Sequence, residues 1–305
     1  MKIIQVDTQK NILVRAFRVL RNEGFRCIVG AAKKYIVEDS WIGRLYVRFK
    51  YGENLVLKEI QGNKMYLDPR DHGISTELLV CGVHEKGATR VLREILKEGM
   101  KVVDIGANIG YYALIEAQIV GRKGIVYAIE PEPRNFELLN KNVLVNNFED
   151  IVKCFQIAIA DKEGEAKFYI SDKSNLHSLI PRSECSRHVM IKTTTLDIFL
   201  RDKGPIDFVR MDVEGFEYNV IKGATNTLKR TKNIKLFIEF HPPEIEAQGI
   251  SLRAFIEGLN NLGFEPIAVV KERSNKIIRD ISMEELYDCI LKGGYHVFLE
   301  KKRKR

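Results

Sequence analysis

The residues best suited to chemistry lie in the run VVDIGANIGYY, residues 102–112. This run has the pattern of a buried strand, a glycine turn and the start of a helix, whose first N–H groups lack helical partners. Gly106 and Gly110 permit backbone angles closed to other residues and let a ligand approach the main chain. The dinucleotide fingerprint needs a second glycine where this chain has Asn108, so a pyrophosphate is disfavoured. Asp104 would repel a phosphate but suits an ammonium group such as that of S-adenosylmethionine.

An acid also follows the next predicted strand, residues 124–130. Glu130 lies twenty residues beyond Gly110, and a carboxylate at that place can accept hydrogen bonds from both hydroxyls of a ribose. The order strand, turn, helix, strand and acid predicts an adenosine-containing ligand. Within that class, the glycine spacing favours S-adenosylmethionine over a nicotinamide or flavin dinucleotide. The alternative without a ligand is an ordinary tight turn from a strand to a helix.

Two acids and a histidine come at the ends of two later predicted strands. Asp212 and Glu214 follow one strand and His241 ends the next, at the edge where an open α/β sheet has its ligand crevice. Methyl transfer to an alcohol needs in-line attack and removal of the hydroxyl proton, which a carboxylate or an imidazole can accept. These three residues are therefore predicted to be catalytic. The structural alternatives are that Asp212 caps the next helix, that Glu214 pairs with Arg210 or Lys222, and that His241 only shapes its loop.

Strand and helix patterns alternate through most of the chain. The predicted strands begin at residue 102 and then cover residues 124–130, 152–160, 166–171, 205–212, 234–241, 264–271 and 295–301. The predicted helices are one that stops at Gly99 and those of residues 133–146, 217–229 and 251–262. This alternation predicts an α/β fold with a mostly parallel sheet covered on both faces. The final strand follows a Gly-Gly turn and is expected to be an antiparallel edge strand.

The first 70 residues are expected to form an α+β extension, followed by an S-adenosylmethionine-binding domain of residues 71–305. Residues 11–22 have the apolar spacing of an amphipathic helix with arginines on its outer face. Such a helix packs on its own domain or lies on a membrane surface. Strand-like alternation and turn residues between 44 and 67 predict β-hairpins.

The formal net charge of +8 is concentrated at the two ends of the chain. Residues 1–50 carry eleven Lys or Arg against four Asp or Glu, and residues 301–305 are all basic. Basic ends attract nucleic acid, anionic lipid headgroups or an anionic substrate, or they only keep the protein in solution.

The chain shows no signal for a disulfide framework, a zinc site or a membrane span. Its five cysteines are scattered singly and its six histidines have no paired spacing, so no residue is assigned to a metal. No apolar stretch approaches the roughly 18 to 20 residues of a spanning helix, and the first residues lack the apolar segment of a secretory signal. We therefore expect a cytoplasmic protein, with attachment at the membrane surface as a further option for the basic ends.

With these residues assembled, the chain resembles the FkbM-type S-adenosylmethionine-dependent methyltransferases over roughly residues 68–270. The resemblance is carried by the segments 103–112, 129–133, 138–142, 161–164, 195–197 and 210–217, and by Ala158. It implies a class I methyltransferase fold, Rossmann-like, with a mostly parallel seven-stranded sheet and an antiparallel edge strand. The family pattern usually has lysine where this chain has Arg210, and the two are not interchangeable.

The resemblance also implies roles for single residues. The glycine turn would hold the methionine end of the cofactor, Glu130 the ribose, and Ala158 would lie near the adenine. Ser75 and Glu85 belong to a segment similar to the family's acceptor-side lid. The expected cofactor-binding set is Glu85, Asp104, Gly106, Ala107, Asn108, Gly110, Tyr111, Glu130, Pro131, Ala158 and Asp212.

The function that follows is O-methylation of a hydroxyl on a carbohydrate, glycan or glycolipid, because the family commonly methylates sugars, glycans or polyketide-type hydroxyls. The main alternative is an RNA methyltransferase that uses the basic termini to bind phosphates. The chain has no recognisable RNA-binding module and no Asn-Pro-Pro-Tyr-type motif for base methylation. A binding module without catalytic activity would leave the whole cofactor constellation unused.

Overall fold

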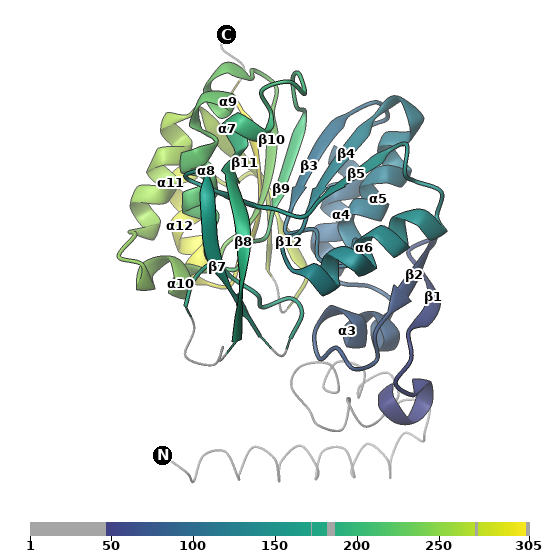
Figure 1. The fold of residues 1–305 in the computed structure, drawn as a ribbon. Helices are drawn as coiled ribbons and strands as arrows, with labels where there is room; N and C mark the ends of the chain where they lie inside the picture. Colours follow the sequence, from purple (N-terminus) through teal and green to yellow (C-terminus); the bar gives the residue numbers. More distant parts are fainter. Residues whose placement is uncertain (1–46, 172, 182–186, 272–273, 303–305) are drawn as a thin grey trace, which may run out of the picture.

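The computed structural model describes residues 47–171, 173–181, 187–271 and 274–302. Its centre is an eight-stranded sheet in the order β12-β11-β13-β10-β9-β3-β4-β5 (Figure 1). These strands are β3 (Lys101–Ile105), β4 (Ile125–Ile129), β5 (Val152–Phe155), β9 (Phe208–Met211), β10 (Lys235–Glu239), β11 (Phe264–Lys271), β12 (Lys276–Ile278) and β13 (His296–Lys301). Strands β5, β4, β3, β9 and β10 are parallel to one another, whereas β13 is antiparallel to both of its neighbours.

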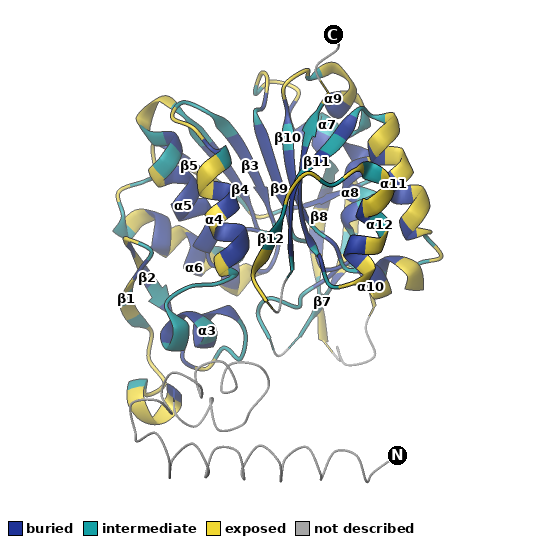
Figure 2. Cartoon of the chain, turned by 180° about the vertical axis from the view of Figure 1, so that it is seen from behind, coloured by how far each residue is buried: buried dark blue, intermediate teal, exposed yellow. Residues whose placement is uncertain are grey.

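Helices cover both faces of this sheet, because its central strands are apolar on both sides. In β3, Val102 packs into the apolar cluster on one face and Val103 into the cluster on the other. The first face is covered by α4 (Lys86–Ile95), α5 (Tyr111–Val120) and α6 (Pro133–Val145), while α3 (Ile74–Cys81) packs on the strand of residues 63–67. The second face is covered by α7 (Leu196–Phe199), α8 (Glu217–Gly223), α9 (Thr225–Arg230), α10 (Pro242–Ala247), α11 (Leu252–Asn261) and α12 (Met283–Leu291). Figure 2 shows α4, α6, α11 and α12 buried toward the sheet and exposed on their outer sides, whereas α5 is buried over most of its surface.

The predicted α/β class is confirmed, but the sheet differs from the expectation in two ways. Strand β13 is antiparallel as expected, yet it lies inside the sheet between β10 and β11. The antiparallel edge strand is β12, which brings the number of strands to eight instead of seven. Only three residues long, β12 is too short to produce a strand pattern in the sequence.

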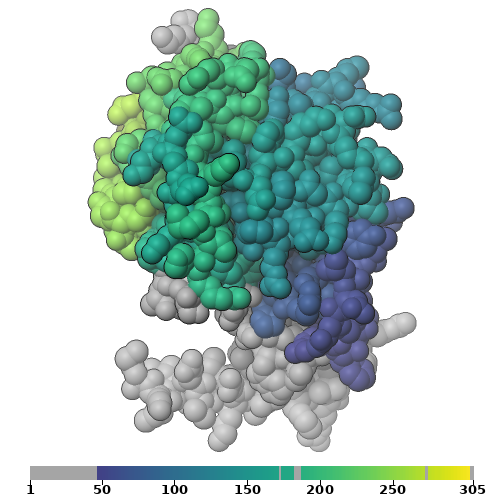
Figure 3. Space-filling view, in the orientation of Figure 1, coloured from purple at the N-terminus to yellow at the C-terminus, as the bar shows by residue number. Residues whose placement is uncertain are grey.

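The predicted strand of residues 152–160 is in fact two strands that belong to different sheets. Its second half, β6 (Ala158–Ala160), joins β7 (Gly164–Ile170) and β8 (Arg187–Thr195) in a small sheet of order β6-β8-β7. This small sheet stands on the front of the molecule in teal and green (Figure 3). The apolar residues of β8 are the consecutive Val189, Met190 and Ile191, with polar residues on either side, so the strand has no apolar alternation by which to predict it.

The described part of the N-terminal extension contains one hairpin, β1 (Val56–Ile60) with β2 (Asn63–Leu67), as predicted. Residues 47–51 are helical and not a strand. Val47 is buried while Phe49 is 95% exposed, because residues two apart point to different sides of a helix. The predicted amphipathic helix of residues 11–22 lies outside the described residues. Among the described helices, none has both the length and the apolar composition to cross a bilayer.

Candidate active site

The glycine turn is formed as predicted between β3 and α5. Gly106 has φ 81°, and Gly110, with φ 93°, is the N-cap of α5. A Cβ at residue 106 would lie 1.9 Å from the backbone oxygen of Asp212, so only glycine lets this turn pack against the end of β9. Asn108 also has a positive φ, 50°, and its side chain donates to the carbonyl of Ser174 at 2.9 Å.

A cleft opens beside this turn. Seven of the predicted site residues line it: Gly106, Asn108, Glu130, Pro131, Ala158, Asp212 and Glu214. The remaining predicted residues lie around it without lining it: Glu85, Asp104, Ala107, Gly110, Tyr111 and His241. The structure therefore brings the ends of β3, β4 and β9 to one cleft, as expected for parallel strands, together with the start of β6 from the small sheet.

The sequence did not reveal one wall of the cleft, which comes from the segment after β7. Ser174, Asn175, His177 and Leu179 line the cleft together with Phe168 of β7. The segment has no regular secondary structure that would produce a periodic pattern. Asn108 and Asn135 both donate to the carbonyl of Ser174 and hold the segment against the glycine turn.

Glu130 is buried at the floor of the cleft. Its Oε2 accepts from the backbone N–H of Asn108 at 2.8 Å, and its Oε1 accepts from that of Glu132 at 2.8 Å. Burial raises the pKa of Glu130 to about 8, although the two hydrogen bonds favour the carboxylate. A ligand hydroxyl that donates to this carboxyl group would favour its charged form further.

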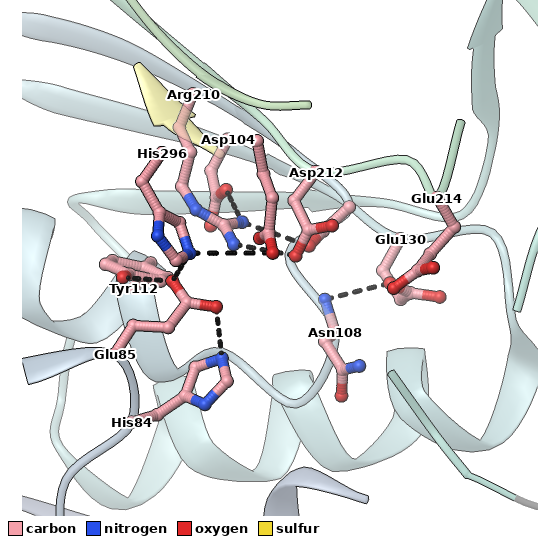
Figure 4. A network of polar contacts seen from close by, with 12 residues as sticks. His84, Glu85, Asp104, Asn108, Tyr112, Glu130, Arg210, Asp212, Glu214 and His296 are labelled. Atoms are coloured by element: carbon pink, nitrogen blue, oxygen red, sulfur yellow. Dashed lines mark hydrogen bonds and ion pairs between the residues drawn. The ribbon is translucent and has the colours of Figure 1, made fainter. Parts of the chain in front are cut away.

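Arg210 connects two of the predicted acids behind the cleft (Figure 4). Its Nη1 donates to Oδ1 of Asp104 at 2.9 Å, and its Nη2 donates to Oδ2 of Asp212 at 3.0 Å. The guanidinium carbon lies 4.1 Å from the ring centre of Tyr112. Asp104 is completely buried, and burial raises its pKa despite the arginine. The planar fork of arginine allows this double contact, which a lysine ammonium could not make in the same way.

The three predicted catalytic residues are close together. One carboxylate oxygen of Asp212, one of Glu214 and one imidazole nitrogen of His241 lie within 4.8 Å of one another. The Nδ1 of His241 lies 2.8 Å from Oε1 of the fully buried Glu217, and its Nε2 lies 3.6 Å from Oε2 of Glu214. Burial lowers the pKa of His241, but Glu214 and Glu217 raise it by more, so it lies well above its ordinary value.

Two of the structural alternatives for these residues are not found. No side chain caps the N-terminus of α8, so Asp212 is not a helix cap there. Lys222 pairs with Asp161 at 2.9 Å, and Arg210 pairs with Asp104 and Asp212.

Glu85 lies on the far side of Arg210, at the N-terminus of α4, with φ 44°. The Tyr112 hydroxyl donates to its Oε2 at 2.7 Å, and Nε2 of His84 lies 2.9 Å from its Oε1. The Nε2 of His296 approaches the same carboxylate at 3.3 Å (Figure 4). Glu85 therefore belongs to a buried polar network next to the cleft.

Comparison with known proteins agrees with this geometry. The family model of the methyltransferase FkbM domain matches residues 104–266. The chain belongs to the FkbM methyltransferase family. This FkbM protein is 28% identical to the 2-O-methyltransferase NoeI of Sinorhizobium fredii over 185 residues, which are 55% of this chain and 73% of NoeI. It is also 28% identical to the hexuronic acid methyltransferase AglP of Haloferax volcanii over 162 residues, which are 52% of this chain and 62% of AglP.

Solved structures similar to this FkbM protein are more distant. A putative rRNA methylase from Clostridium thermocellum is 12% identical with a TM-score of 0.45, over 72% of this chain and 96% of that one. An S-adenosylmethionine-dependent O-methyltransferase from Thermotoga maritima is 14% identical with a TM-score of 0.41, over 73% and 67% of the two chains.

Proposed function

We propose that the protein transfers the methyl group of S-adenosylmethionine to a hydroxyl of a carbohydrate, glycan or glycolipid. The observation that carries the proposal is the meeting of the glycine turn, Glu130 and Asp212 around one cleft. The acceptor class is supported by NoeI and AglP, whose names describe a 2-O-methyltransferase and a hexuronic acid methyltransferase.

The residues of the cleft fit this cofactor. Asn175 Oδ1 and Asp212 Oδ1 are buried, face no hydrogen-bond donor within the described residues, and belong to residues that line the cleft. Such acceptors need donors from a ligand, because a buried polar atom without a partner costs about 1–3 kcal/mol. Ribose hydroxyls, an adenine amino group and an ammonium group are donors of this kind.

The cofactor supplies an electrophilic methyl group, and the protein has to hold the acceptor and accept its proton. In our proposal, Glu130 accepts hydrogen bonds from the ribose, and the glycine turn lets the cofactor approach the backbone. Glu214 and Glu217 raise the pKa of His241 well above its ordinary value, which favours the protonated form of the imidazole. A carboxylate is therefore the better proton acceptor, and Asp212, which lines the cleft, is our candidate.

Calorimetry and labelled cofactor test the proposal. We expect S-adenosylmethionine to bind, and Glu130→Ala to weaken binding, while Glu149→Ala at an exposed position leaves it unchanged. Label transferred from the cofactor should appear in a glycan extract. Binding of NAD in place of S-adenosylmethionine would reject the cofactor, and label in an RNA extract alone would reject the acceptor class.

A further inference from the structure

We propose that Glu85, Glu239 and His296 bind a divalent transition-metal ion beside the methyl-transfer cleft. The sheet brings two of them together, because β10 and β13 are antiparallel neighbours whose register pairs Glu239 with His296. The third ligand comes from the N-terminus of α4. The sequence could not indicate this site, since the three residues come from elements far apart in the chain.

The donor atoms have the spacing of ligands around one ion. The Nε2 of His296 lies 3.3 Å from Oε2 of Glu85 and 3.5 Å from Oε1 of Glu239. Two ligands of one ion with bonds of about 2.0–2.2 Å lie roughly 3–3.5 Å apart when the angle between them is near 100°. A small side-chain adjustment is therefore enough for His296 to share an ion with Glu85 and with Glu239.

The ring of His296 has the carboxylates of Glu85 and Glu239 as its charged partners, both through Nε2. The residue is only 2% exposed, and neither nitrogen makes a hydrogen bond within the described residues. A buried ring nitrogen without a hydrogen bond is costly, and here Nε2 contacts a carboxylate oxygen of Glu85 and one of Glu239. Figure 4 shows the contact with Glu85. Coordination of Nε2 to an ion held by both carboxylates gives this nitrogen a partner, while Nδ1 keeps none within the described residues.

The surrounding residues fix Glu85 in the orientation of a ligand. The Tyr112 hydroxyl donates to Oε2 at 2.7 Å, and His84 contacts Oε1 at 2.9 Å. His84 is held in turn by Glu77 at 2.5 Å. Outer partners of this kind orient metal-binding side chains and raise metal affinity.

Charge also favours a cation at this position. Two carboxylates, those of Glu85 and Glu239, share the single imidazole of His296. A divalent ion neutralises these carboxylates more completely than one imidazolium does. The mixture of two carboxylate oxygens and one imidazole nitrogen suits Mn²⁺, Fe²⁺ or Zn²⁺, whereas Ca²⁺ and Mg²⁺ prefer oxygen ligands.

The site is close enough to the cleft to influence an acceptor. Glu239 Oε1 lies 3.9 Å from Nε2 of His241, which lies 3.6 Å from the carboxylate of Glu214 in the cleft wall. An ion here can coordinate an acceptor oxygen and lower the pKa of its hydroxyl. This consequence for catalysis rests on the proposed function, whereas binding of the ion does not.

Titration of the full chain with Mn²⁺, followed by electron paramagnetic resonance, tests the site. We expect one tightly bound Mn²⁺ per chain, and pulsed measurements should show a directly coordinated imidazole nitrogen. Affinity should fall about tenfold or more in Glu239→Gln and in His296→Asn. The matched controls are Glu137→Gln and His188→Asn at exposed positions, which should bind Mn²⁺ like the unchanged protein.

The result that overturns the proposal is a chain that binds no Mn²⁺, or one whose bound ion shows no nitrogen coordination. Equal affinity in the unchanged protein and in Glu239→Gln would overturn it as well. The nitrogen signal is measured on the unchanged protein, so a variant that fails to fold does not affect it. Bound Mn²⁺ without methyl transfer to any glycan would reject the proposed function and leave the metal site standing.

Discussion

At the scale of single residues, the cleft depends on acids that the protein buries to different degrees. Arg210 contacts Asp104 and Asp212 together, but Asp104 is fully buried, whereas the side chain of Asp212 is 20% exposed and lines the cleft. A partly exposed carboxylate in the cleft wall can be reached by an acceptor hydroxyl, whereas a fully buried one cannot. Asp212 is therefore the acid best placed to take a proton from an acceptor hydroxyl.

Replacement of Asp212 by asparagine tests this role. Asp212→Asn keeps the shape of the side chain but removes its basicity, so we expect kcat to fall about 10²- to 10⁴-fold. Affinity for S-adenosylmethionine, measured by calorimetry, should change much less. If the variant turns over at the full rate, Asp212 is not the proton acceptor, and the same measurement on Glu214→Gln would examine the second carboxylate.

At the scale of elements, the junction of β3 and α5 positions the site, because it packs directly on the end of β9. The turn has two backbone hydrogen bonds to Ile129 at the end of β4, from Gly106 and Ala107, both at 2.9 Å. Asp212 N–H donates to the carbonyl of Ile105 at 3.0 Å. Three strand ends are thereby fixed relative to one another before any ligand binds, which lowers the entropic cost of binding.

Gly106→Ala should disrupt this junction. The new Cβ would lie 1.9 Å from the Asp212 backbone oxygen at φ 81°, so we expect a loss of about 3 kcal/mol or more in the free energy of unfolding, and loss of cofactor binding. Gly249→Ala is the control, since Gly249 has φ 75° with no atom within 4 Å of the added Cβ. It should lose only about 1–2 kcal/mol from backbone strain. Similar losses in the two variants, measured by urea denaturation, would contradict the close packing at Gly106.

At the scale of the whole molecule, stability is coupled to pH through buried acids. The pKa of Glu130 is about 8 in the folded protein against 4.5 for an ordinary glutamate, with burial as the cause. Between pH 4.5 and pH 8, the folded state therefore keeps a proton on Glu130 that the unfolded state has lost. Glu130 contributes stability that is fully present below pH 4.5 and declines as the pH rises toward 8.

Glu130→Gln removes this titration. We expect the free energy of unfolding of the ligand-free variant to fall less steeply between pH 4.5 and 8 than that of the unchanged protein. Chemical denaturation at several pH values measures both slopes, and the exposed Glu149→Gln should leave the slope as it was. Identical slopes for Glu130→Gln and the unchanged protein would show that Glu130 titrates like an ordinary carboxyl group.

The sequence by itself determined the parts of the protein that have a local signature. The apolar run before Asp104, the two glycines and Glu130 predicted the strand, the turn and the cleft, because periodicity and backbone freedom are properties of neighbouring residues. The position of Asp212 at a parallel strand end followed from the same reasoning.

Only the tertiary structure decided which distant residues meet. The partner of Asp104 and Asp212 is Arg210, the wall of the cleft includes Asn175, and Glu239 faces His296 across two strands. This last pairing exists because β13 lies inside the sheet, between β10 and β11. Its place depends on which strands the final strand pairs with. Such choices are set by the packing of the whole sheet and leave no pattern in the residues of any one strand.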